Sequence, residues 1–151
     1  MSGRSGEGTV SGDGGRLLGI DYGSKRIGLA VSDPDGRVAV VLETFARSDD
    51  RRAARYVARV AAREGVAGLV LGEPRRLDGT RGEAAERVTR FARRLEATTG
   101  LPVTLVDESL TSVEAERRLR AAGVDPAADP GRVDAVAAQI LLQEVLDRRR
   151  V

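Results

Sequence analysis

The order of strand and helix signals constrains the fold more strongly than any other feature of this sequence. Three short segments with strand character come first, at residues 16–21, 26–32 and 37–45. Turn signals rich in Gly, Ser, Asp and Pro separate them at residues 23–25 and 33–36. Short strands joined by tight turns are typical of an antiparallel meander. We therefore expect the domain to open with three antiparallel strands.

Helix and strand patterns alternate after the meander. The segments are a helix at 50–64, a strand at 68–72, a helix after a capping box at 80–83, a strand at 103–106, a helix from 111 to 123 and a last helix from 130. Thr80 and Thr111 have capping-box spacing to a following Glu, and Asp129 precedes Pro130 as the expected cap of the last helix. The order βββαβαβαα predicts an α/β fold, a ribonuclease-H-like mixed five-stranded sheet with helices on its faces.

The length of 151 residues fits one domain of ordinary size. Residues 1–15 are rich in Gly and lack apolar periodicity, so we expect a disordered N-terminal tail followed by one domain at 16–151. No apolar run approaches the roughly 20 residues that span a bilayer. The N-terminus lacks a secretory signal pattern, and we expect a cytoplasmic protein without membrane contact.

The complete absence of Cys and His limits the chemistry available to this chain. It excludes disulfides, thiolate zinc sites, cysteine nucleophiles, Ser-His-Asp triads and imidazole bases. Catalysis would have to use carboxylates, hydroxyls, Lys, Arg, Tyr or an ion held by oxygen ligands. The net charge of +2 is too small for binding nucleic acid by bulk charge alone, so local clusters of Arg matter more.

Acidic residues follow two predicted strands at the point where each ends. Asp21 closes the first strand, and Glu108 follows the fifth. Because ligands of open α/β sheets gather at strand ends, we interpret both as site residues. The alternatives are that Asp21 bonds to the amide of Gly23 in a turn, and that Glu108 only assists the start of the next helix.

Asp134 lies in the second turn of the last helix, where Asp129 already supplies the cap. Small residues at 137 and 138 would let this helix approach the sheet, so the carboxylate of Asp134 could face the strand ends. An ordinary surface Asp is the alternative. Asp21, Glu108 and Asp134 together predict a site for Mg²⁺ or Mn²⁺ that hydrolyses phosphodiester bonds.

Five segments of the chain resemble the YqgF family, also called RuvX. They are GIDYG at 19–23, KRIGLAVSD at 25–33, LDGT at 77–80, VDESLTSVEA at 106–115 and VDAVAA at 133–138. The resemblance spans residues 17–147 in order and implies a ribonuclease-H-like fold similar to RuvC Holliday-junction resolvases. It also implies maturation of the 5′ end of pre-16S rRNA, with Asp21, Glu108 and Asp134 as the catalytic acids.

Two departures from the family pattern suggest further site residues. Gly72-Glu73-Pro74-Arg75-Arg76 stands where members commonly have Gly-Leu-Pro. The resemblance to RuvC implies an acidic ligand near this strand end, so Glu73 is a candidate fourth metal ligand. A solvated loop acid or a partner of an Arg is the alternative. Ser109 stands where Arg is usual, and Arg75 or Arg76 could replace that Arg as a phosphate clamp.

Three residues next to Asp21 are further candidates for binding the substrate. Lys25 and Arg26 could contact phosphates, and Tyr22 could stack on a base. For Tyr22, packing in the core or at its edge is the alternative. For Lys25 and Arg26, the alternative is a solvated hairpin.

The substrate stays open at this point. Precursor rRNA, free or in ribosomal particles, is favoured, and branched DNA is the alternative. Symmetric cleavage of a junction would require a homodimer rather than a monomer. A non-catalytic RNA-binding protein of the ribosome or of transcription is a further reading. An actin-like or sugar-kinase-like ATPase, suggested by residues 21–24, is disfavoured because that class needs two such domains.

Overall fold

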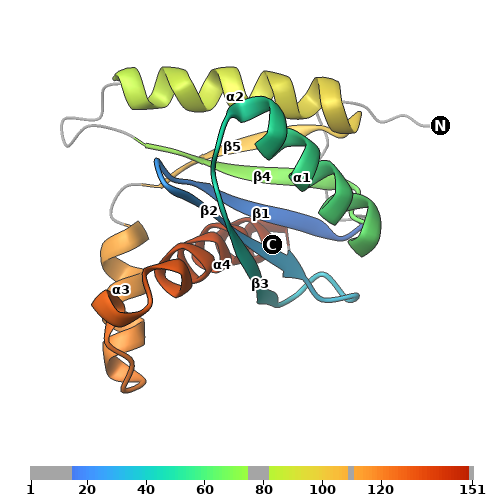
Figure 1. The fold of residues 1–151 in the computed structure, drawn as a ribbon. Helices are drawn as coiled ribbons and strands as arrows, with labels where there is room; N and C mark the ends of the chain where they lie inside the picture. Colours follow the sequence, from blue (N-terminus) through green and yellow to red (C-terminus); the bar gives the residue numbers. More distant parts are fainter. Residues whose placement is uncertain (1–14, 75–81, 109–110, 150–151) are drawn as a thin grey trace.

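The structure is a computed structural model that describes residues 15–74, 82–108 and 111–149 (Figure 1). Apart from Gly15, the predicted tail lies outside these ranges, as do Arg75, Arg76, Thr80 and Ser109. The elements are β1 (Leu17–Tyr22), β2 (Arg26–Ser32), β3 (Ala39–Ala46), α1 (Asp50–Glu64), β4 (Gly68–Glu73), α2 (Glu83–Thr99), β5 (Val103–Asp107), α3 (Thr111–Ala121), a 3₁₀ turn (Pro126–Ala128) and α4 (Pro130–Arg149).

The first three strands form the predicted antiparallel meander. β1 pairs antiparallel with β2, and β2 pairs antiparallel with β3. The amide of Gly23 donates to the carbonyl of Arg26 across the β1–β2 turn, with 3.0 Å between the two atoms. This bond closes a tight hairpin and places residues 23–25 at one end of the sheet.

β3 begins two residues later than the sequence pattern indicates. The carboxylate of Asp33 accepts hydrogen bonds from the amides of Arg37 and Val38, at 2.8 and 3.1 Å. These bonds extend the turn and keep both residues out of the strand. The predicted start at residue 37 is therefore wrong, and β3 starts at Ala39.

Two parallel strands complete the sheet, in the order β3-β2-β1-β4-β5. β4 lies parallel to β1 on one side and to β5 on the other. The carboxyl ends of β1, β4 and β5 therefore lie at the same edge of the sheet, close to the β1–β2 turn. The mixed five-stranded sheet predicted from the sequence is confirmed.

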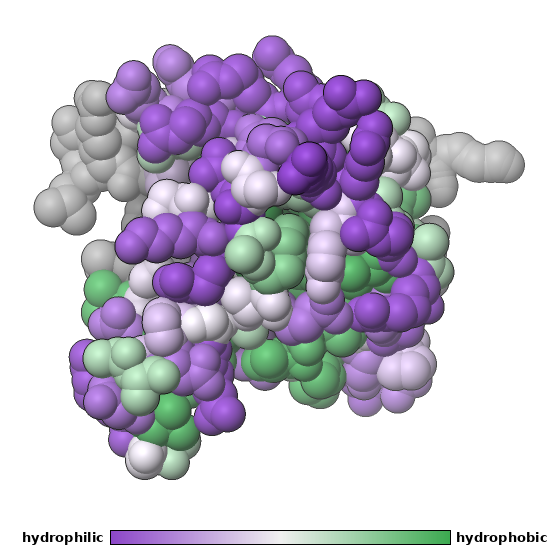
Figure 2. All heavy atoms as spheres, in the orientation of Figure 1, coloured by the Kyte–Doolittle hydropathy of each residue, from purple (hydrophilic) through white to green (hydrophobic). Residues whose placement is uncertain are grey.

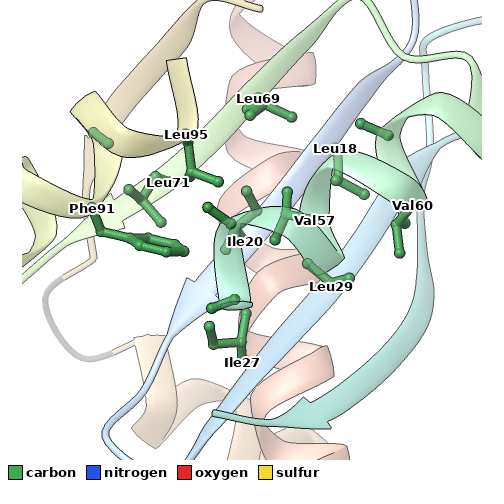
Figure 3. Close-up of a cluster of buried hydrophobic side chains, with 14 of the residues drawn as sticks. Leu18, Ile20, Ile27, Leu29, Val57, Val60, Leu69, Leu71, Phe91 and Leu95 are labelled. Atoms are coloured by element: carbon green, nitrogen blue, oxygen red, sulfur yellow. The ribbon is translucent and has the colours of Figure 1, made fainter. Parts of the chain in front are cut away.

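Helices cover both faces of this sheet (Figure 1). Helices α1 and α2 pack on one face, where the buried cluster includes side chains from β1, β2 and β4 (Figure 3). α4 packs on the other face against Leu17, Val70 and Val106. Successive residues of a strand point to opposite faces, so each strand contributes to both clusters. Because apolar side chains of β1 are buried on both faces, the alternation along the strand determines which residues of β1 face α4.

The starts of three helices differ in how they are capped. For α2 the residue before the first turn is Gly82, with no side-chain cap, and Thr80 of the predicted capping box lies outside the described residues. Thr111 is the first residue of α3, and its hydroxyl donates to the carbonyl of Glu108 at 2.7 Å instead of capping an amide. The cap predicted for α4 is confirmed, because Asp129 accepts from the amide of Arg132 at 3.2 Å.

None of the helices in the described part of the chain combines the length and the apolar character needed to cross a membrane.

Candidate active site

A pocket of about 250 Å³ lies where β1 and β5 end and α4 begins. It contains all three predicted acids together with the β1–β2 turn. Its lining residues are Asp21, Tyr22, Gly23, Ser24, Lys25, Arg26, Glu108, Ser112 and Asp134. Residues far apart in the sequence thus meet in one hollow.

Asp21 is the most buried of the three acids, with 7% of its surface exposed. Leu17 packs with the α4 cluster, and β1 alternates, so Asp21 points to the α4 face. The amide of Gly23 is bonded to Arg26 rather than to Asp21. Asp21 therefore does not have the turn-forming role that was the alternative.

Asp134 reaches the pocket because Gly28 lets α4 approach the sheet. Gly28 is the partner of Asp21 across the β1–β2 ladder. A Cβ added to Gly28 would lie only 2.2 Å from the carbonyl oxygen of Asp134. No other residue fits there, since real Cβ atoms do not approach a backbone atom so closely. The glycine thus brings the start of α4 next to Asp21.

Glu108 lies over a second glycine. A Cβ on Gly72 would be 2.6 Å from Oε1 of Glu108, so the side chain of Glu108 crosses β4 on the α4 face. Two bonds fix its backbone: its amide donates to the carbonyl of Glu73 at 3.2 Å, and its carbonyl accepts from the hydroxyl of Thr111. Glu108 is thereby held over the strand end and beside Asp21.

The two neighbouring carboxyl groups share a hydrogen bond, and the pKa of Asp21 rises to about 8. Burial is the largest cause, followed by the negative charges of Glu108 and Asp134. Burial also raises the pKa of Glu108. At neutral pH, Asp21 therefore keeps its proton and donates it to Glu108. A pair of buried carboxyl groups that shares a proton is a candidate site for a metal cation, which would replace that proton.

Arg26 holds the third carboxylate. Its Nε lies 2.7 Å from Oδ2 of Asp134 in a partly buried ion pair. Burial raises the pKa of Asp134, and Arg26 lowers it. Within residues 15–74, 82–108 and 111–149, no three acidic side chains are arranged as ligands around one point. The three acids share a pocket, but Asp134 is turned to Arg26.

Tyr22 lines the pocket but is occupied by protein contacts. Its ring stacks on Phe91 with 4.4 Å between ring centroids, and the guanidinium of Arg47 lies 4.7 Å from the ring centroid. Its hydroxyl donates to Asp50 at 2.6 Å. Tyr22 is thus a packing residue that ties β1 to α1 and α2, which is the alternative reading of this residue.

Glu73 does not reach the pocket. Its neighbour Gly72 faces α4. Leu69 and Leu71, which point to the same side of β4 as Glu73, belong to the cluster under α1 and α2. Its side chain is buried on that opposite face. The structure therefore separates Glu73 from Asp21 and Glu108.

Ser24 and Ser112 line the pocket and were not singled out as site residues from the sequence. Ser112 lies four residues after Glu108, at the start of α3, and this short separation is the signal that the sequence offers. Arg75, Arg76 and Ser109 lie outside the described residues.

The sheet order, the two helical layers and the acidic pocket define the chain as an α/β domain of the RuvC-like ribonuclease-H fold. Two solved structures share this fold. RuvC from T. thermophilus, in complex with a Holliday junction substrate, has a TM-score of 0.59 at 20% identity, covering 91% of this chain and 97% of that one. The resolvase of fowlpox virus has a TM-score of 0.54 at 10% identity, covering 88% and 97%.

Sequence comparison places the chain within one family of this class. A family model described as RuvX, Holliday junction resolvase, matches residues 15–148. The chain belongs to the RuvX family. Two of its relatives, both named "Putative pre-16S rRNA nuclease", are from Syntrophus aciditrophicus (47% identity; 87% of this chain, 88% of the relative) and Anaeromyxobacter dehalogenans (47%; 89% and 98%).

Proposed function

We propose that this chain is a nuclease that hydrolyses phosphodiester bonds at the 5′ end of pre-16S rRNA. The observation that carries the proposal is the convergence of Asp21, Glu108 and Asp134 in one pocket of a RuvX-family chain. Relatives at 41–47% identity carry a name that specifies this substrate. We place the reaction in the cytoplasm, on free precursor or on ribosomal particles.

The proposal includes Mg²⁺ or Mn²⁺ as the cofactor. The residues fit such a cation, because the pair of buried carboxyl groups retains a proton that a cation would replace, and hard oxygen ligands suit these metals. Asp21 and Glu108 would hold it, joined by Asp134 once Arg26 releases that carboxylate. A bound divalent cation activates water and neutralises charge on the phosphate.

The protein's own side chains would orient the substrate. Arg26 and Lys25 line the pocket on the turn beside Asp21. We propose that a phosphate of the RNA replaces Asp134 as the partner of Arg26, since a guanidinium group pairs with phosphate as well as with carboxylate groups. Lys25 would add a second positive charge beside the same phosphate.

Cleavage of branched DNA is the second candidate function. The family description names a Holliday junction resolvase. The chain is only 10–20% identical in sequence to the two solved resolvases, however, and this similarity shows the fold alone. A non-catalytic RNA-binding role does not account for the cost of burying carboxyl groups side by side.

The experiment compares four labelled substrates with Mg²⁺ or Mn²⁺: a 16S rRNA fragment with its 5′ extension, an unrelated single-stranded RNA, duplex RNA and a four-way DNA junction. The Asp21→Asn variant is the control for contaminating nuclease. We expect cleavage of the extended fragment near the mature 5′ end, and no cleavage by the variant. Preferred cleavage of the junction, or equal cleavage by Asp21→Asn, would contradict the proposal.

A further inference from the structure

One face of the molecule carries many exposed arginines, most of which form no ion pair within the described residues. They project from the exposed sides of α1 and α2, which pack against each other. Figure 2 shows strongly hydrophilic side chains gathered over these two helices. We call this surface the arginine face; it consists of Arg51, Arg52, Arg55, Arg59, Arg87, Arg90, Arg93 and Arg94.

Several arginines on α3 and α4 form ion pairs with acids one turn away. On α3, Arg117 and Arg118 pair with Glu114 at 2.7 and 2.9 Å. On α4, Arg148 pairs with Glu144 at 3.9 Å. These pairs follow the usual i,i+3 and i,i+4 spacing of surface helices.

The arginine face has less of this compensation: Glu83 and Glu86 precede Arg87 and Arg90 by four residues on α2, but no ion pair joins them in the described part of the chain. Counting the residues that the structure describes, its only ion pair joins Arg52 to Asp49, at 3.7 Å between two exposed side chains. On α1, Arg51, Arg55 and Arg59 follow one another at i,i+4 spacing, so each faces another positive charge. Such like-charge spacing destabilises an isolated helix. A bound polyanion would relieve this repulsion.

A groove at the edge of this face adds a shaped surface to the charge. It measures about 280 Å³ and is lined by Arg52, Arg55 and Arg59 together with two aromatic rings, Phe45 and Tyr56. The two rings stack with 3.9 Å between centroids, and Arg59 lies over Tyr56 at 5.5 Å. The hydroxyl of Tyr56 also donates to Glu43, so both rings are engaged by protein contacts, as Tyr22 is. The groove therefore offers the positive charges of its arginines to a phosphate backbone, and not a free ring for base stacking.

The groove adjoins the catalytic pocket. Ala46 of β3 lines the groove and is the ladder partner of Arg26, which lines the pocket. The next residue, Arg47, donates from its amide to Lys25 and from its guanidinium to Ser24, at 2.9 and 3.1 Å. The end of β3 and Arg47 thus connect the groove to the β1–β2 turn, which lines the pocket. A strand that left the pocket past this turn would run toward the groove that Arg55 and Arg59 line.

We propose that the arginine face, through Arg55 and Arg59, binds the phosphate backbone of the RNA that extends from the catalytic pocket. This inference rests on the proposed function for the identity of the RNA, but not for the binding itself. The face lacks the acids of the pocket and takes no part in bond cleavage. It supplies affinity and fixes the direction in which the strand crosses the protein, without reading sequence.

The test measures RNA binding in the Asp21→Asn background, where cleavage does not interfere. Fluorescence anisotropy with a labelled single-stranded RNA compares Arg55→Gln/Arg59→Gln with Arg117→Gln/Arg118→Gln, which removes the same charge from α3. We expect the first double variant to bind roughly tenfold more weakly at low salt and to lower the slope of log K against log salt by about 1.4, since each contact with a single strand contributes about 0.7. The α3 double variant should bind like its background, and thermal unfolding should show both variants folded.

The inference would be overturned if Arg55→Gln/Arg59→Gln bound RNA with the same affinity and salt slope as the Asp21→Asn background. Equal losses in the two double variants would also overturn it, because net charge alone would then explain the effect. Failure of the proposed function gives a different result: the parent would cleave none of the RNA substrates, while RNA binding would still depend on Arg55 and Arg59.

Discussion

Asp21 is the residue whose protonation couples the site to stability. In the unfolded chain its carboxyl group titrates near its ordinary value of 3.8, whereas in the folded protein its pKa is about 8. Between these values the folded state holds a proton that the unfolded state has lost. Stability contributed by this group is therefore present below pH 4 and is lost as the pH rises toward 8.

The Asp21→Asn variant should reverse this loss. Asn is uncharged at every pH and keeps a donor for Glu108, so the metal-free variant should exceed the parent in stability by about 1–3 kcal/mol at pH 8. The difference should shrink toward pH 5. Thermal unfolding in chelator across this range measures it, with Asp35→Asn on an exposed turn as the control. A difference between Asp21→Asn and the parent that stays constant with pH would contradict the assignment.

Arg26 offers a second test at the scale of the residue. Since its guanidinium occupies Asp134, Arg26→Gln should free this carboxylate and remove a positive charge beside the pocket. We expect Mn²⁺ to bind about threefold to tenfold more tightly, in line with the loss of an ion pair worth about 1 kcal/mol. RNA binding should weaken in the same variant. Calorimetric titration with Mn²⁺ and with RNA measures the opposite changes in the two affinities. Arg26→Lys should have affinities between those of the parent and those of Arg26→Gln. Weaker Mn²⁺ binding by Arg26→Gln would exclude competition between Arg26 and the metal.

The site depends on how closely α4 approaches β2. Gly28 permits this contact, and an added Cβ would overlap the backbone of Asp134. Because backbone atoms on both sides are fixed by their elements, α4 would have to move as a unit. The position of the third acid is thus a property of helix packing, not of its own side chain alone.

Gly28→Ala should therefore destabilise the protein by about 2–4 kcal/mol and reduce cleavage even at temperatures where the variant is folded. Gly131→Ala is the matched control, since a Cβ there would meet Thr44 at an ordinary 3.5 Å. It should change the free energy of unfolding by less than about 1 kcal/mol. Urea unfolding compares the two, and equal stability of the two Ala variants would show that the Gly28 contact has no role.

At the scale of the whole molecule, the chain order of elements was predictable because each has a local signal. Helix α1 has the predicted bounds, since apolar periodicity and its Gly65 end lie within one segment. The pocket was predictable only in part. Asp21 stands out locally, but the pairing of Arg26 with Asp134 joins residues 108 positions apart. No local pattern indicates that Tyr22 stacks on Phe91, or that Glu73 faces away from the pocket.

The fold places the proposed catalytic site and the proposed RNA-binding surface on different parts of the molecule. The acids lie at one edge of the sheet on the α4 face, while the arginine face lies on α1 and α2 across the β1–β2 turn. A net charge of only +2 is compatible with the proposed binding of a polyanion, because several arginines of α3 and α4 are paired with acids of their own helix. Charge is concentrated where the RNA strand is proposed to run.

The central claim is that the carboxylates of Asp21 and Glu108 act as one catalytic unit. Single-turnover cleavage of the 5′-extended 16S fragment with Mn²⁺ tests it in Asp21→Asn, Glu108→Gln and the double variant. Residues that act as a unit give non-additive losses, so each single change should lower the rate at least about 100-fold and the double variant should be no slower than the slower single one. The account would be contradicted if the rate loss of the double variant equalled the product of the two single losses, or if the single variants cleaved as fast as the parent.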